Sequence, residues 1–176
     1  MEFVLIRHTR CAVASGTCYG RLDVPLAHSA ADDIAHTLDQ TPHVDIVFSS
    51  PAQRCLQLAN ALASRDRCEL HVMPELQELD FGAWEGLRWD EISRSESDPW
   101  AEDPWNRAPP AGETESELWV RVQALAERLH QITRVRRIAV IGHGGPLRAL
   151  RCILTRTAID ERWSLNMGCG EVVRIA

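Results

Sequence analysis

Two histidines follow apolar segments that have the character of buried strands. Residues 3–6 lead into Arg7 and His8, and residues 138–141 lead through a glycine into His143. Short continuous apolar runs rich in β-branched side chains are typical of parallel strands. The carboxyl ends of such strands meet at one edge of a sheet, where α/β proteins place their active sites. We therefore expect His8 and His143 in one site, although a structural role would explain either histidine alone.

A second arginine, Arg54, lies in the first turn of a predicted helix. This helix follows a strand predicted over residues 44–48, with Ser50 as its expected N-cap and Pro51 as its first residue. A cation opposes the dipole at that end, unless an anion lies between them. A solvated surface arginine is an equally good explanation of Arg54 taken by itself.

Together these residues predict a site for a phosphoryl group. Arginine forks and helix N-termini both bind phosphate oxygens, and Arg7 and Arg54 supply two such forks. The two histidines lack the close Cys, His or Asp companions of zinc or two-metal centres, and the six cysteines form no close pair. We therefore expect no metal and no cofactor.

Composition limits the classes of partner. The 176 residues suit one domain, and the formal net charge of −6 argues against binding to nucleic acid or to an anionic membrane. A small phosphorylated metabolite remains compatible, because clustered arginines make a cleft locally positive. We find no signal-peptide pattern and no apolar run near ~20 residues, and we expect a cytoplasmic protein with reduced thiols. The composition does not indicate an oligomeric state.

The order of the predicted elements favours an α/β fold. Strands and helices alternate, which predicts a three-layer αβα sandwich around a mainly parallel sheet. Further helices are expected over residues 30–38 and 89–95, and after a capping box formed by Thr114 and Glu117. The closing residues 161–175 should add one or two strands.

Residues 84–112 form an acidic, proline-rich segment that contains four of the six tryptophans. We expect a lid or insertion over a cleft within a single domain of residues 1–176. Simple packing of a loop onto the body would explain each tryptophan equally well. The four tryptophans are Trp84, Trp89, Trp100 and Trp105.

Five motifs match a known family in order along nearly the whole chain. They are Leu5-Ile6-Arg7-His8, Ser49-Ser50-Pro51-x-x-Arg54, Glu78-x-Asp80-Phe81-Gly82-x-Trp84-Glu85-Gly86, Pro110-Ala111-Gly112-Glu113 and Gly142-His143-Gly144-Gly145. On these motifs the chain resembles the histidine phosphatase superfamily, in the branch that includes the cofactor-dependent phosphoglycerate mutases. The resemblance implies a phosphoglycerate mutase-like fold.

The resemblance also implies roles for matching residues. His8 would be the nucleophile that forms a phosphohistidine, Arg7 and Arg54 would bind the phosphoryl oxygens, and His143 would donate to them. Glu78 would protonate the leaving oxygen and then help to deprotonate water. From periodicity alone, three nearby acids remain alternatives to Glu78, namely Glu75, Asp80 and Glu85. The expected substrate-binding residues are Arg7, Tyr19, Arg21, Arg54, Trp84 and Gly144.

The chain departs from the family pattern after the nucleophile. Thr9 replaces the usual glycine, and Arg10 and Cys11 stand where Glu-Thr is common. The position of a frequent asparagine falls at about Ala14, which removes one expected phosphate contact. Arg10 or Arg21 is the candidate replacement.

Residues 18–26 together with residues 81–86 are most similar to α-ribazole phosphatases. The resemblance therefore favours a metal-independent phosphomonoesterase that removes the 5′-phosphate of α-ribazole 5′-phosphate in cobalamin synthesis. A broad-specificity phosphatase of sugar phosphates or nucleotides is one alternative. A non-catalytic module that only binds phosphate groups is the other, and the altered residues 9–14 keep it open.

Overall fold

A five-stranded sheet forms the centre of the protein, whose residues 1–176 are all described by a computed structural model. The strands lie in the order β3-β2-β4-β1-β5, and only β5 runs antiparallel to its neighbour. The expectation of a mainly parallel sheet is therefore confirmed. The strands are β1 (Glu2–Arg7), β2 (Ile46–Ser49), β3 (Glu69–Val72), β4 (Arg137–Gly142) and β5 (Val172–Ile175).

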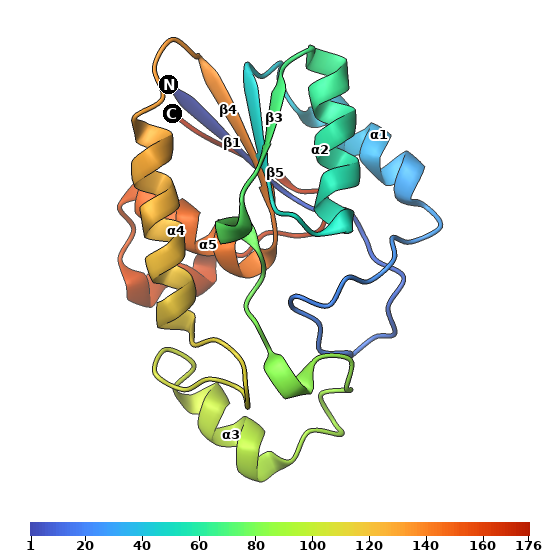
Figure 1. The fold of residues 1–176 in the computed structure, drawn as a ribbon, viewed down its shortest axis with the longest axis vertical. Helices are drawn as coiled ribbons and strands as arrows, with labels where there is room; N and C mark the ends of the chain where they lie inside the picture. Colours follow the sequence, from blue (N-terminus) through green and yellow to red (C-terminus); the bar gives the residue numbers. More distant parts are fainter.

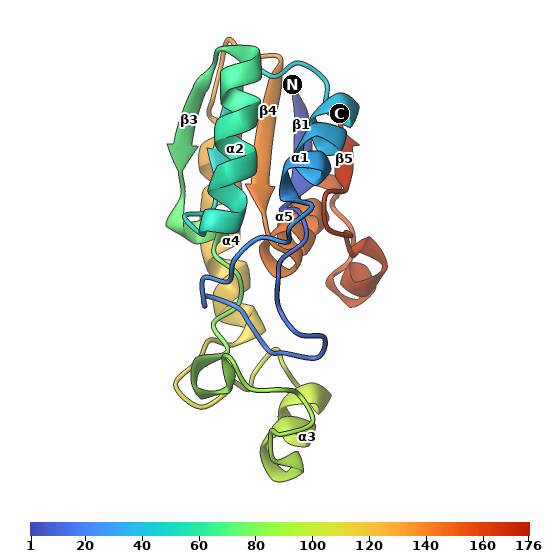
Figure 2. The ribbon, with the colours of Figure 1, turned by 90° about the vertical axis from the view of Figure 1, so that its right-hand side faces the viewer.

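Helices cover both faces of this sheet (Figures 1 and 2). Phe3 and Leu5 pack with α4 and α5 on one face, whereas Val4 and Ile6 pack with α1 and α2 on the other. Successive side chains of a strand point to opposite faces, so β1 contributes to both layers. The three-layer αβα sandwich is confirmed. The helices are α1 (Ala30–Gln40), α2 (Gln53–Asp66), α3 (Arg94–Glu102), α4 (Glu115–His130) and α5 (Gly144–Thr155), with 3₁₀ turns η1 (Pro74–Leu76), η2 (Gly82–Trp84) and η3 (Ile159–Leu165).

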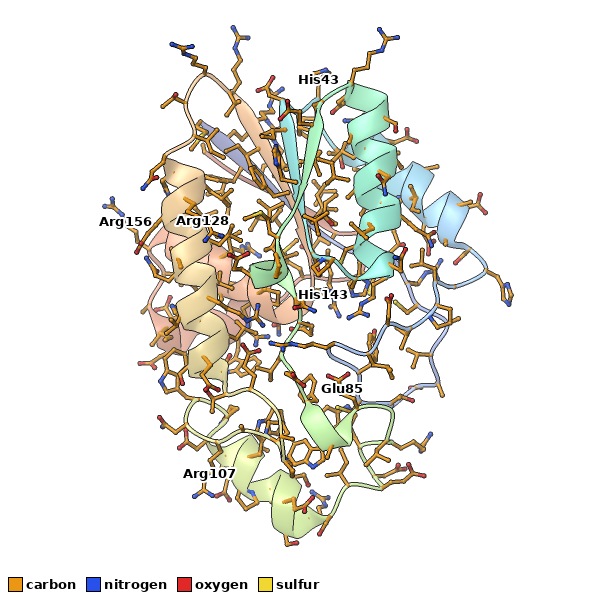
Figure 3. The ribbon with its side chains drawn as sticks, in the orientation of Figure 1. His43, Glu85, Arg107, Arg128, His143 and Arg156 are labelled. Carbon is orange, nitrogen blue, oxygen red and sulfur yellow. The ribbon has the colours of Figure 1, made fainter.

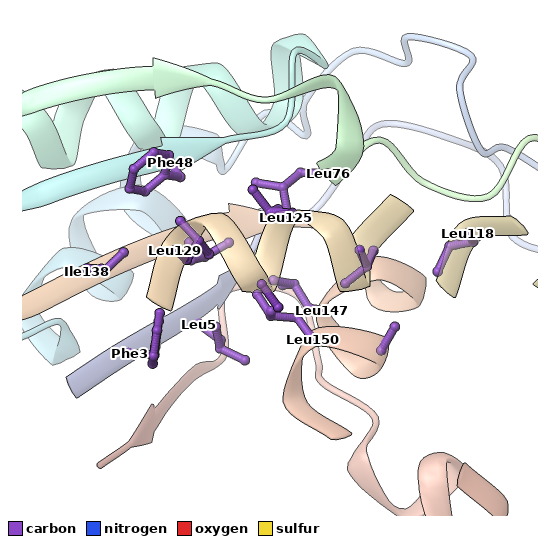
Figure 4. Packing of buried hydrophobic residues seen from close by; sticks show 14 of the residues in the cluster. Phe3, Leu5, Phe48, Leu76, Leu118, Leu125, Leu129, Ile138, Leu147 and Leu150 are labelled. Carbon is purple, nitrogen blue, oxygen red and sulfur yellow. The ribbon is translucent and has the colours of Figure 1, made fainter. Parts of the chain in front are cut away.

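Helix α4 supplies much of the larger core. Its buried stripe, which includes Leu118, Leu125 and Leu129, packs towards β1 and β4 (Figure 4). The helix begins with the expected capping box, in which the Thr114 side chain and the Glu117 side chain each accept the other's backbone N–H. Two orphan N–H groups are thereby satisfied at the end of α4 that faces the site.

Two local predictions are wrong. Helix α2 begins at Gln53 and has no side-chain cap, because the Ser50 hydroxyl lies against His143. The helix expected over residues 89–95 is replaced by turns, and α3 begins only at Arg94. The backbone N–H of Trp89 donates to Gly16 across the molecule instead of to a helical carbonyl.

Two segments extend beyond the carboxyl ends of the parallel strands. In Figures 1 and 2 the loop before α1 and the segment around α3 lie below the sheet. They are joined to each other by a β-bridge between Thr17 and Arg88. None of the helices is long and apolar enough to cross a bilayer. Residues 161–175 contain the end of η3 and one strand, β5, where one or two strands were expected.

Truncation of Leu125 should destabilise the protein strongly. This side chain is fully buried in the core between α4 and the sheet, so Leu125→Ala should lower the free energy of unfolding by about 2–5 kcal/mol. Val120 on the same helix is 71% exposed, and Val120→Ala should change it by less than about 0.5 kcal/mol. Denaturant unfolding measures both, and equal losses would contradict the assignment of the inner face of α4.

Candidate active site

A cavity of about 180 Å³, here called the central pocket, lies where β1 and β4 end. Both predicted histidines and both predicted arginines line it together with Glu78, so the tertiary structure brings together the five residues expected to carry the chemistry. The nine lining residues are Arg7, His8, Thr17, Tyr19, Arg54, Glu78, Phe81, Trp89 and His143.

The hydrogen bond of His8 determines its tautomer. Its Nδ1 lies 2.7 Å from the backbone oxygen of Thr9, which is an acceptor only, so Nδ1 carries the proton and Nε2 keeps a free lone pair. Burial lowers the pKa of His8 to about 4; the bond to Thr9 opposes this shift and the charges of Arg54 and Arg7 add to it. A neutral imidazole with a free Nε2 is a competent nucleophile near pH 7.

His143 has the opposite tautomer. Its Nδ1 accepts from Nε of Arg54 at 3.2 Å, so its Nε2 carries the hydrogen, 2.8 Å from the Ser50 hydroxyl. Burial lowers the pKa of His143 well below its usual value, and the neighbouring His8 and the charges of Arg54 and Arg7 add to this effect. The ring centroids of His8 and His143 lie 5.1 Å apart. His143 is therefore a neutral imidazole beside the free lone pair of His8, and its one N–H is bound to the Ser50 hydroxyl.

The guanidinium of Arg54 is only 1% exposed. One terminal nitrogen donates to the backbone oxygen of Leu22 at 2.8 Å, and the other donates to that of Gly20 at 2.5 Å. With the bond to His143, three of its five N–H groups are used, and two make no hydrogen bond, although the carboxylate of Asp23 lies 4.0 Å from one terminal nitrogen. The ring of Tyr19 lies 5.4 Å from the guanidinium carbon. The positive charge of Arg54 near the N-terminus of α2 is thus stabilised largely by two backbone carbonyl groups.

Glu85 fixes the Gly20–Leu22 turn, whose carbonyl groups bind Arg54. Its carboxylate accepts the backbone N–H groups of Arg21 at 2.8 Å, of Phe81 at 3.1 Å, and also of Leu22. The carbonyls of this same turn face the Arg54 guanidinium. Figure 3 shows Glu85 in the segment below His143. Sequence reasoning considered Glu85 only as a spare acid, although its place in the quoted motif was a signal of importance.

Arg7 has an unsatisfied donor. One of its terminal nitrogens donates to the backbone oxygen of Met167 at 2.6 Å, but Nε is buried and has no partner. Buried N–H groups without a partner are rare, and a bound anion would satisfy this one. A Cβ at Gly144 would lie 3.6 Å from the guanidinium carbon, an ordinary contact distance, and Gly144 lines the neighbouring cavity instead of the central pocket. Arg7 therefore forms the wall of the central pocket that is suited to an oxyanion.

Glu78 lies at the N-terminus of α5. Its carboxylate accepts from the backbone N–H of Leu79 at 2.9 Å and from that of Gly145 at 3.1 and 3.2 Å. A Cβ at Gly145 would stand 2.3 Å from Oε1, so this position favours glycine. Of the four acids that the sequence left open, only Glu78 lines the central pocket. Glu75 instead pairs with Arg128 on α4.

Two of the predicted substrate-binding residues have structural roles. The Arg21 guanidinium pairs with Asp80 at 3.1 Å and Glu113 at 3.5 Å, because the Gly20–Leu22 turn packs on that segment. Trp84 is buried in a small cluster of its own and donates to Glu96, so it does not line the central pocket.

The remaining candidates divide in a simple way. Arg10 pairs with Asp33 at 2.6 Å and does not line the central pocket. Tyr19 lines the pocket as expected. Phe81, Trp89 and Thr17 line it as well, and the sequence indicated no role for Thr17. No group of three or more His, Cys, Asp or Glu side chains is arranged to hold a metal ion.

Comparisons with known proteins give one family. The sequence profile described as histidine phosphatase superfamily (branch 1) matches residues 3–176. The adenosylcobalamin/α-ribazole phosphatase of Escherichia coli is 26% identical over 183 residues, which cover 99% of this chain and 90% of that protein. Phosphoserine phosphatase 1 of Hydrogenobacter thermophilus is 26% identical over 176 residues, covering 96% and 82%. The α-ribazole phosphatase of Shigella flexneri has the same fold, with a TM-score of 0.92 at 23% identity over 100% of this chain and 90% of that one.

The low pKa of His8 predicts a loss of stability in acid. Between pH 6.5 and about 4 the unfolded chain binds a proton at His8 that the folded protein excludes, so stability falls as the pH is lowered through this range. The contribution of His8 should reach about 3 kcal/mol at pH 4. His8→Asn keeps a donor for the Thr9 carbonyl and removes the titration. Urea unfolding at several pH values should show that the free energy of unfolding falls less steeply with decreasing pH in His8→Asn than in the wild type. Equal slopes would show that the folded protein does not exclude a proton from His8.

Loss of the Glu85 charge should weaken oxyanion binding, although Glu85 does not line the central pocket in which the anion would bind. Glu85→Gln leaves fewer acceptors for the turn that positions Arg54, and inhibition by vanadate should weaken about tenfold. The matched control is Glu91→Gln, because the Glu91 carboxylate likewise accepts one backbone N–H in a turn, that of Arg88. Equal inhibition of wild type and Glu85→Gln, with both folded by circular dichroism, would show that the turn does not position Arg54.

Proposed function

The chain belongs to branch 1 of the histidine phosphatase superfamily and is a phosphomonoesterase, and from this premise we propose that it acts through a phosphohistidine at His8 without a metal ion. The observation that carries the proposal is the free Nε2 of a buried, neutral His8. Two cationic side chains, Arg7 and Arg54, share its pocket. A phosphorylated small molecule is the type of substrate that this family takes.

The first step forms a bond between Nε2 of His8 and phosphorus while the bond from phosphorus to the leaving oxygen breaks. The unpaired Nε of Arg7 and the N–H groups that remain on Arg54 stabilise the phosphoryl oxygens, and the Nε2–H of His143 joins them by exchanging the Ser50 hydroxyl for a phosphoryl oxygen. Glu78 donates a proton to the leaving alkoxide.

The second step releases phosphate. Glu78, now a carboxylate, accepts a proton from water while the water oxygen attacks phosphorus and the nitrogen–phosphorus bond breaks. His8 returns to its neutral form with Nδ1 still bound to Thr9. The changes at residues 9–14 leave this arrangement intact, because none of Arg10, Cys11 and Ala14 lines the central pocket. Together with family membership, this argues against a module that only binds phosphate.

As the substrate we propose α-ribazole 5′-phosphate, whose 5′-phosphate would be removed in cobalamin synthesis. Support comes from the motifs of residues 18–26 and 81–86 and from the relative in Escherichia coli. Phosphoserine is the competing substrate, because the relative from Hydrogenobacter is equally similar. A broad preference for sugar phosphates or nucleotides is the third alternative.

We also propose that residues 84–112 act as a lid within a single domain. The rings of Phe81, Trp84, Trp89 and Trp100 pack against one another with centroids 5.5–6.3 Å apart. Trp89 lines the central pocket, and Trp100 lines the cavity beside it. The lid would thus cover the leaving group and exclude water from the site.

A panel of phosphate esters tests both mechanism and substrate. With EDTA present, wild type should release phosphate from α-ribazole 5′-phosphate at least about tenfold more efficiently than from phosphoserine or ribose 5-phosphate. His8→Asn should lose more than about 1000-fold in kcat. Acid-labile, base-stable label from ³²P-substrate should appear on wild type only. Loss of activity in EDTA would refute the metal-independent mechanism, and a flat panel would refute the choice of substrate.

A further inference from the structure

A second cavity adjoins the central pocket and is larger, at about 460 Å³. We call it the aromatic pocket, because Phe81, Trp100 and Trp163 form part of its lining. Arg7 and Glu78 border both cavities. Glu78 is the proposed proton donor to the leaving oxygen, so the leaving group lies at the border that the aromatic pocket shares with the central pocket.

A buried ionic cluster forms one end of this pocket. Glu115 is 5% exposed and accepts from Arg148 at 3.2 Å and from Arg162 at 2.9 Å. Arg148 also donates to the side-chain oxygen of Asn166 at 3.1 Å. Glu115 carries one negative charge for the two guanidinium groups of Arg148 and Arg162, so this end of the pocket keeps a net positive charge. Both guanidinium groups are held in place by Glu115, and Arg7 is committed to the phosphoryl group.

The other lining groups suit a planar ring. The Arg148 guanidinium lies over the indole of Trp163, 4.0 Å from its centroid, yet this indole remains 50% exposed. A large aromatic surface left open in a pocket is a common feature of ligand sites. The indole of Trp100 adds a second tryptophan ring to the lining.

We propose that the aromatic pocket selects substrates whose leaving alcohol carries an aromatic or heteroaromatic ring, with Trp163 and Arg148 as specificity-determining residues. The inference rests on the proposed phosphomonoesterase mechanism and deepens it. The ring stacks on the side of the pocket formed by Trp163, and Arg148 holds that indole in place from its anchor on Glu115. Small alcohols such as serine gain no stacking.

The experiment compares esters of the same primary alcohol with and without a ring. α-Ribazole 5′-phosphate and adenosine 5′-monophosphate carry an aromatic base on ribose, whereas ribose 5-phosphate lacks it. Wild type should prefer the better aromatic riboside to ribose 5-phosphate by at least about tenfold in kcat/KM. Trp163→Ala should remove about tenfold from the riboside and less than about twofold from ribose 5-phosphate.

A second pair of variants covers the case in which Trp163→Ala does not fold. Arg148→Lys keeps a charge for Glu115 but loses the planar contact with Trp163, and it should reduce the preference for the riboside. Arg151→Lys, on the same helix and outside the pocket, should keep the wild-type preference. Thermal unfolding shows that each variant is folded.

The possible failures are distinct. If ribose 5-phosphate or phosphoserine is hydrolysed as efficiently as the aromatic ribosides, or if Trp163→Ala slows all esters equally, the aromatic selection is wrong while the phosphohistidine mechanism stands. If no ester is hydrolysed and His8 takes up no label, the proposed function itself fails and this inference fails with it.

Discussion

A guanidinium cannot lose its charge inside a protein, so a buried arginine needs acceptors for its N–H groups. At Arg54 this requirement shapes the whole site. The acceptors are two carbonyls of the Gly20–Leu22 turn and the Nδ1 of His143. The carboxylate of Glu85 fixes this turn by accepting its backbone N–H groups. Three segments far apart in the chain are thus fixed around one cation, two of whose N–H groups remain free.

The same burial sets the protonation of the histidines. Two imidazoles enclosed beside Arg7 and Arg54 are kept neutral, because burial disfavours their charge and the arginines repel it. Their tautomers differ, since His8 donates from Nδ1 to a carbonyl and His143 accepts at Nδ1 from Arg54. One histidine therefore presents a lone pair and the other an N–H. That combination suits attack on a phosphoryl group and stabilisation of its oxygens.

Local sequence patterns predicted the layers of the fold well, because strand and helix periodicity depends on neighbouring residues. The apolar runs before His8 and His143 are adjacent strands, and the capping box at Thr114 begins α4. The patterns failed where a distant partner competes for a group. Ser50 stands before a proline, as an N-cap residue often does, but its hydroxyl lies against His143. Trp84 is an aromatic candidate by composition, yet it is buried in a cluster of the α3 segment.

The sequence by itself determined the family, the three-layer fold and four of the residues that line the central pocket, Arg7, His8, Arg54 and His143. It could do so because the two histidines and Arg7 stand where strands end, and because Arg54 lies in the first turn of the helix after a further strand. Only the tertiary structure decided which acid lines the pocket and which arginines are free to bind an anion. Arg21 is compensated by Asp80 and Glu113, whereas Arg7 retains a buried N–H without a partner. The charge balance of an arginine depends on residues brought beside it by folding, and sequence spacing carries no record of them.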